Sequence, residues 1–175
     1  KKTGAKIVGI FGKKGMLDKE HYQRLSKSNL ESAKGFKIFM FHNLIAEFSH
    51  GKFDKIIEMA LPMSFLPKGF DYYAGGHPHF VKHKAIEDYG IVAYPGPIFP
   101  NNMEEIEQLG HGGFYIVEAN GKALSLNWVP VKIYNVVSVE IDCNEKNPDE
   151  ITGELSELLK EKEASCMSLP TLPSC

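Results

Sequence analysis

Short apolar runs and amphipathic segments alternate along the chain, a pattern typical of a domain that mixes strands with helices. A β-rich run at 5–11 is followed at 17–35 by apolar side chains at helical spacing, and Gly35 supplies a stop signal. The pattern therefore predicts a strand and then one helix. Three unbroken apolar runs come later, and each predicts a buried strand: 36–43, 70–76 and 90–96. A further helical segment is expected at 53–60.

The second half of the chain has the pattern of a β-rich unit. Segments 114–119 and 122–131 flank Asn120-Gly121, a pair that predicts a hairpin with a type I′ turn because both central residues of that turn need positive φ. The run at 133–143 is expected to extend this β structure.

An amphipathic helix is predicted at 148–163. Asn147 can cap this helix, Pro148 fits its first position, and Glu150 completes a capping box. The last twelve residues, 164–175, have no periodicity and contain two prolines. They predict a disordered tail.

The order of these elements predicts the fold class. Strand, helix, strand, helix and strand are followed by a loop or brief helix at 101–113 and then by hairpins. This order indicates a mixed sheet with helices on one side and an antiparallel sheet packed behind it. We therefore expect an α/β (α+β) sandwich.

Composition adds few constraints. The chain has 175 residues, 20 basic and 22 acidic side chains and a formal net charge of −2, so no overall basic field indicates a polyanion partner. No apolar run approaches the roughly 20 residues needed to span a bilayer, so we expect no membrane association. Three widely spaced cysteines favour a reducing compartment, and we expect a cytoplasmic protein. The chain begins without methionine, and we expect it to be part of a longer protein.

Three histidines share one placement in this pattern. His42, His77 and His79 each follow the C-terminal end of a predicted buried strand, the edge at which open α/β sheets assemble their sites. Neutral imidazole is a common ligand for zinc, manganese and iron. Gly75 and Gly76 would let the backbone turn sharply and let a ligand approach closely. Spacing alone leaves two interpretations open, a metal site and solvated residues at strand ends.

The remaining candidates are interpreted as follows. His83 could add a local ligand, but it falls on a segment expected to be an exposed loop, and we expect a surface residue. His21, His50 and His111 are also expected at the surface. Asp71 could support a metal ligand, although an aspartate that starts a strand is more often a turn residue. No nucleophile elbow and no phosphate loop occur in the sequence, so it gives no support for serine or cysteine catalysis.

Several motifs in one order carry a resemblance to a known family. FDYYAGGHPH has LPMSFLPKG ahead of it, and IVAYPGPIFP and GGFYIVE follow. Together they resemble the SbcD and meiotic-recombination-eleven family of DNA repair nucleases, which are calcineurin-like metallophosphoesterases. The family's Gly-His-x-His, Tyr-Pro-Gly and Lys-Gly-Phe-type motifs correspond to 76–79, 94–96 and 113–115, and its isolated strand-end histidine corresponds to His42. The resemblance runs from about 5 to 145.

The resemblance implies a calcineurin-like metallophosphoesterase fold with a site of two divalent metal ions, expected to be Mn²⁺. His42 and His77 would ligate one ion and His79 the other. The family's Asp-x-His, Gly-Asp-x-x-Asp and Gly-Asn-His motifs do not occur here, and we expect them upstream of Lys1. The chain would then be the C-terminal half of the nuclease domain, and a poor catalyst by itself.

The resemblance also implies partners and a domain arrangement. Residues 1–145 would belong to the nuclease domain, and 146–163 would begin a DNA-capping domain. The expected partners are DNA and an ATPase of the SbcC or Rad-fifty type, with a homodimer in the full-length protein. Two alternatives stay open: a calcineurin-like phosphodiesterase or phosphatase that acts on small nucleotides, and a metal-free scaffold protein that keeps the fold.

Overall fold

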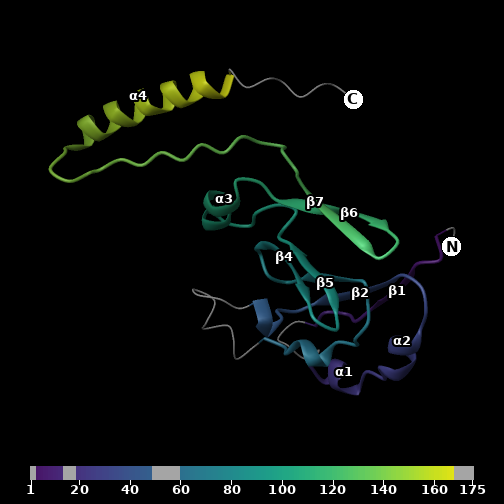
Figure 1. Cartoon of the computed structure of the whole chain (residues 1–175). Coiled ribbons are helices and arrows are strands. Elements are labelled where there is room, and N and C mark those ends of the chain that lie inside the picture. Colours follow the sequence, from purple (N-terminus) through teal and green to yellow (C-terminus); the bar gives the residue numbers. More distant parts are fainter. Residues whose placement is uncertain (1–2, 14–18, 49–59, 168–175) are drawn as a thin grey trace.

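A five-stranded sheet organises the first half of the chain (Figure 1). The computed structural model describes residues 3–13, 19–48 and 60–167, with side chains as far as residue 164. The strands lie in the order β1-β2-β3-β5-β4. Their bounds are β1 Lys6–Gly9, β2 Lys37–His42, β3 Tyr72–Gly76, β4 Val81–Ile86 and β5 Gly90–Pro95. The first four strands in this order are parallel and β4 is antiparallel to β5, so the sheet is mixed, as predicted.

The strand β4 was not expected from the sequence. Three of its six residues are exposed, none is fully buried, and it carries Lys82 and Lys84, so it lacks the apolar alternation that marks a half-buried strand. Charged side chains are typical of an edge strand, where they discourage pairing with another chain. The interpretation of this segment as a loop, with His83 on it, is therefore wrong.

The helical pattern at 17–35 forms two short helices within its described part, where the sequence predicts one. They are α1 Lys19–Arg24 and α2 Ser28–Ser32. Tyr22 of α1 is fully buried against the sheet, and the buried Lys37 donates from Nζ to the carbonyls of Leu30 and Glu31 at 3.2 and 3.0 Å. The lysine therefore caps the C-terminal end of α2, whereas the break between the two helices falls at 25–27, where Lys27 Nζ donates to the Ser64 carbonyl at 2.6 Å. The helix expected at 53–60 lies outside the described residues, apart from Ala60.

Short 3₁₀ turns, η2 Ala46–Phe48 and η4 Met63–Phe65, lie between β2 and β3. The main core forms on the face of the sheet that α1 and α2 cover. Its fully or almost fully buried aromatic residues are Tyr22, Phe39, Phe41, Phe48, Phe70, Tyr73 and Tyr94.

The strand β2 is buried on one face only. Its Phe39 and Phe41 point into the core, whereas Met40 between them is 51% exposed. The prediction of burial on both faces is wrong for this strand, because the antiparallel layer behind the sheet lies over β4 and β5. Contacts of Tyr115 with His83 and of Trp128 with Pro95 join the two layers there.

That second layer is a hairpin of β6 Gly113–Asn120 and β7 Ala123–Pro130. It lies on the side of the sheet opposite α1 and α2 (Figure 1). Asn120 pairs with Ala123, and only Gly121 in the turn has positive φ, at 62°. The hairpin prediction is confirmed, but the type I′ turn centred on Asn120-Gly121 is wrong. The segment 133–143 forms no strand and does not extend the sheet.

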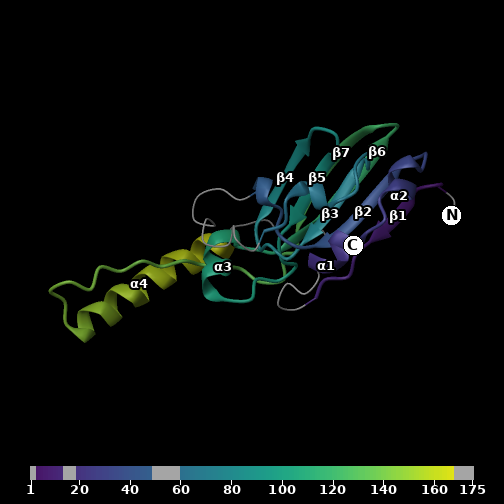
Figure 2. The same ribbon diagram turned by 90° about the horizontal axis from the view of Figure 1, so that it is seen from below.

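Two helices complete the described chain, α3 Met103–Leu109 and α4 Pro148–Met167. The capping box of α4 is confirmed, because Asn147 Oδ1 accepts from Glu150 N at 3.0 Å and Asn147 N donates to Glu150 Oε2 at 2.8 Å. The helix continues beyond the predicted end at residue 163, into the segment expected to be a disordered tail. It projects away from both sheets in two perpendicular views (Figure 1 and Figure 2).

Candidate metal centre

The carboxyl ends of β2 and β3 bring two of the predicted histidines together. His42 is the last residue of β2 and pairs with Gly76, the last residue of β3, so His77 follows directly beside it. The ring centroids of His42 and His77 are 5.4 Å apart at an interplanar angle of 68°. The parallel register of the two strands is the cause of this meeting.

Two glycines make room for the His42 ring. A Cβ on Gly76 would lie 2.8 Å from His42 Nδ1, and a Cβ on Gly12 would lie 2.8 Å from His42 Cβ and 3.1 Å from Cδ2. Real Cβ atoms do not approach other atoms so closely, so neither position accepts a side chain while His42 keeps this place. Gly12 follows β1, which pairs with β2 on the side away from β3. The ring therefore fits between three neighbouring strand ends.

The backbone turns at His77 itself. His77 has φ of 88°, in the left-handed region that residues with a side chain rarely adopt. Gly75 and Gly76 lie inside β3 without positive φ, so the expectation that they form a sharp turn is wrong. Gly75 instead admits aromatic side chains, since a Cβ there would lie 2.5 Å from Tyr94 Cε1. Backbone strain of this kind clusters at functional sites and costs of order 1–3 kcal/mol.

His79 lies in a separate polar network. Its Nδ1 is 2.8 Å from Oε1 of Glu105, a residue of α3. The other carboxylate oxygen accepts from Asn101 N at 2.8 Å. These contacts lower the pKa of Glu105, with the Asn101 hydrogen bond as the larger cause and the His79 contact next.

A buried tyrosine supports the backbone that follows His42. Tyr94 is fully buried, and its hydroxyl donates to the Asn43 carbonyl at 2.9 Å and accepts from Ile45 N at 3.0 Å. Burial raises the pKa of Tyr94 well above its ordinary value. Next to it, the Pro95 carbonyl accepts from Trp128 Nε1 at 3.0 Å. The Tyr-Pro-Gly segment thus ties β5 to the end of β2 and to the hairpin.

Two pockets lie next to the segment that follows β1, and the first of them reaches His42. One of about 540 Å³ is lined by His42, Gly76, Met40 and Phe11, among others. A second, of about 410 Å³, shares Phe11 with the first and carries basic side chains. These are Lys13, His21 and Arg24. Arg24 also forms an exposed ion pair with Glu20 at 3.7 Å.

The other sequence candidates lie elsewhere. His83 is on β4, with Nδ1 3.2 Å from the Tyr115 hydroxyl. Asp71 accepts from Lys37 N at 2.7 Å at the amino ends of the strands, so it cannot support the histidines. His111 is half-buried with its ring against Tyr134, which contradicts a surface position. His21 is exposed as predicted, and His50 lies outside the described residues.

The donor set fits part of a metal centre. Two imidazole rings that meet edge to face at the end of a sheet can act as two ligands of one ion. Within the described part of the chain, however, no group of three or more His, Cys, Asp or Glu side chains is placed to hold a metal ion. The residues present therefore fit as a half-site that needs further donors.

Two residues of this region were not singled out from the sequence. Gly12 gave no signal, because its role depends on which strand lies beside β2. Glu105 did carry a signal, since it stands three residues after Asn102 in a capping-box pattern. Its contact with His79 follows from the position of α3 and could not be read from that pattern.

Comparison with known proteins gives a distant similarity. No family model matches the chain. In an alignment of 164 residues that covers 91% of the chain, it is 26% identical to the DNA double-strand break repair protein Mre11 of Sulfolobus acidocaldarius. The aligned part is 41% of that protein, so the chain spans less than half the length of this curated relative. None of the described helices is long and apolar enough to cross a membrane.

Proposed function

We propose that this chain belongs to a metal-dependent nuclease that hydrolyses DNA phosphodiesters, in which His42 and His77 ligate one divalent ion and His79 a second. The observation that carries the proposal is the meeting of His42 and His77 at neighbouring strand ends, with ring centroids 5.4 Å apart. The distant similarity to a DNA double-strand break repair protein supports the same interpretation.

The chemistry divides between the ions and the chain. When bound, two divalent ions, expected to be Mn²⁺, would stabilise charge on the phosphodiester oxygens and lower the pKa of a bound water. The chain contributes fixed ligands. Gly12 and Gly76 leave room for the His42 ring, and Tyr94 holds the backbone that follows it. Proton-transfer groups are expected in the motifs that the resemblance places upstream of Lys1.

The second pocket favours DNA over a small nucleotide as the substrate. Lys13, His21 and Arg24 line it, and it shares Phe11 with the pocket that His42 lines. Basic side chains away from the reacting centre can contact further phosphates of a polymer, and such contacts supply most of the affinity for a nucleic-acid backbone. A mononucleotide would have no phosphate to place there.

The arrangement of the whole protein is also a proposal. Residues 1–145 would form the C-terminal half of the nuclease domain, and the helix α4 would begin a DNA-capping domain. The projection of α4 away from the sheets suits a segment that leads into another domain (Figure 2). We further propose that the full-length protein is a homodimer and works with an ATPase of the SbcC or Rad-fifty type.

A cleavage assay with the full-length protein tests this function. Linear duplex DNA with one labelled 3′ end is incubated with Mn²⁺ and with the wild type, His42→Ala, His77→Ala or His83→Ala. We expect the cleavage rate of the first two variants to fall by at least about 100-fold. Mutation of residues that only support metal ligands already lowers metal affinity or activity by about 10–100-fold. His83→Ala is the matched control, since its imidazole contacts Tyr115 and not the proposed centre. It should cleave like the wild type.

Other outcomes would identify the alternatives. Cleavage of a cyclic mononucleotide but not of DNA would favour a small-nucleotide phosphodiesterase. No hydrolysis of either substrate, with Mn²⁺ binding unchanged in His42→Ala and His77→Ala, would refute the metal assignment and favour a scaffold role.

A further inference from the structure

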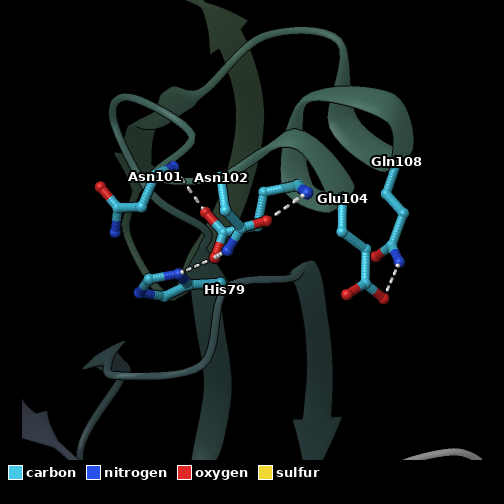
Figure 3. A network of polar contacts seen from close by, with 6 residues as sticks. His79, Asn101, Asn102, Glu104 and Gln108 are labelled. Carbon is cyan, nitrogen blue, oxygen red and sulfur yellow. Dashed lines mark hydrogen bonds and ion pairs between the residues drawn. The ribbon is translucent and has the colours of Figure 1, made fainter.

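The start of α3 contains a carboxylate in an unusual position. Figure 3 shows the polar network there, in which the side chains of His79 and Asn102 lie close together and that of Asn101 points away from them. Glu105 lies at its centre. Its Oε1 contacts His79 Nδ1 at 2.8 Å and accepts from Asn102 Nδ2 at 3.0 Å, while its Oε2 accepts from Asn101 N at 2.8 Å.

The start of α4 allows a direct comparison with the geometry at the start of α3. Both α3 and α4 begin with Asn-x-x-Glu, Asn102 to Glu105 and Asn147 to Glu150. In α4 the glutamate accepts from the backbone N of its own capping asparagine at 2.8 Å, as a capping box requires. In α3 the asparagine caps normally, by accepting from Glu105 N at 2.9 Å, but the glutamate does not return the bond. It bonds to the preceding residue and to a histidine instead.

This difference indicates that Glu105 has a role beyond capping the start of α3. The Glu105 side chain is only 17% exposed, compared with 44% for His79, so the carboxylate is the fixed partner and the imidazole the one it orients. An ionised carboxylate only accepts, so Nδ1 of His79 must carry the proton. In the neutral ring, the lone pair then resides on Nε2.

We propose that Glu105 is a positioning residue for His79, which it holds as the Nδ1–H tautomer with Nε2 available to a divalent cation. This inference rests on the proposed function for the identity of the ligand, though not for the tautomer. A carboxylate behind a ligating histidine fixes the ring orientation and raises its basicity, and loss of such a partner weakens metal affinity by about 10–100-fold.

The tautomer is tested first, in this chain without metal. Long-range ¹⁵N–¹H correlation NMR of the histidine rings at alkaline pH distinguishes the Nδ1–H from the Nε2–H form. We expect Nδ1–H for His79 in the wild type and a shift toward Nε2–H in Glu105→Gln. Glu104→Gln is the matched control, because Glu104 is the neighbouring residue on α3 and bonds to Gln108 at 2.9 Å. It should leave the His79 spectrum unchanged.

Affinity for Mn²⁺ is tested second, by electron paramagnetic resonance titration of the full-length protein. Glu105→Gln should weaken binding by about 10–100-fold and Glu104→Gln should not. If Glu105→Gln unfolds the protein, Glu105→Asp replaces it, since it keeps the charge at the helix start but shortens the reach to His79.

The two measurements separate two failures. An unchanged His79 tautomer in the Glu105 variants would overturn the positioning role, whatever the metal data show. A shifted tautomer with unchanged Mn²⁺ affinity would also overturn it. If His79→Ala binds Mn²⁺ like the wild type, the ligand assignment in the proposed function is wrong instead.

Discussion

Individual residues at the histidine edge depart from the usual preferences of the backbone. His77 has φ of 88°, and this strained conformation persists because β3 and β4 hold both ends of the short loop. His77 keeps this costly conformation beside His42. This indicates that the position of the His77 ring matters more than the local stability of the loop.

The strain at His77 can be measured by comparing two variants. Both His77→Ala and His77→Gly remove the imidazole, but only glycine adopts positive φ without steric cost. We expect His77→Gly to be more stable than His77→Ala by about 1 kcal/mol, measured as the difference in free energy of unfolding in urea. Equal stabilities would mean that the turn stores no strain.

The space beside His42 gives a second prediction. In Gly76→Ala the new Cβ would lie 2.8 Å from His42 Nδ1, so the ring must rotate away. We expect weaker Mn²⁺ binding by the full-length protein, measured by titration, with the fold retained. Gly153→Ala is the control, because that glycine lies in α4 with open space around its Cβ position. If Gly76→Ala binds as tightly as Gly153→Ala, the glycine is not needed for the site.

At the scale of elements, the strand β5 is tied to the segment after β2 by one hydroxyl group. Tyr94→Phe would remove the partner of both the Asn43 carbonyl and Ile45 N. Because the region is buried, we expect a loss of about 1–3 kcal/mol in the free energy of unfolding. Tyr115→Phe removes a more exposed contact with His83 and should cost less than about 0.5 kcal/mol. Similar losses in both variants would contradict this role of Tyr94.

The sequence predicted those elements whose signals are local. The capping box at Asn147 and the hairpin near Gly121 depend on a few adjacent residues, and both formed. The strand β4 could not be predicted, because its charged pattern makes sense only at a sheet edge. The break between α1 and α2, at 25–27, is accompanied by a hydrogen bond from Lys27 Nζ to the Ser64 carbonyl, a contact between residues distant in the sequence.

The site was predictable to a similar degree. The placement of histidines after strand ends, together with a parallel sheet, is enough to predict that His42 and His77 meet. The place of Gly12 and the contact of Glu105 depend on strand order and on the position of α3. These are tertiary features that no short pattern contains.

At the scale of the whole molecule, buried tyrosines link stability to alkaline pH. Burial raises the pKa of Tyr72 to about 12, and it raises those of Tyr73 and Tyr94 further. In the unfolded chain a tyrosine loses its proton near pH 10, so above that pH the unfolded state releases protons that the folded state retains.

We therefore expect the contribution of these tyrosines to the free energy of unfolding to be fully present below about pH 10. It should fall as the pH rises from about 10 to 12. Urea unfolding followed by circular dichroism over this range measures the loss. Tyr72→Phe should make the decline shallower, since one group no longer titrates. A flat profile, or an increase with pH, would contradict the burial of these hydroxyls.

The strand order has a consequence for how the chain opens. His42 ends the interior strand β2, whereas His79 lies just before β4, which forms the outer edge of the sheet. Edge elements undergo local unfolding at lower free energy than interior ones. Amide hydrogen exchange should therefore be faster in β4 than in β2 and β3. The proposed ligands would then belong to two cooperative units, and one of the two proposed ion positions would be lost while the other persists.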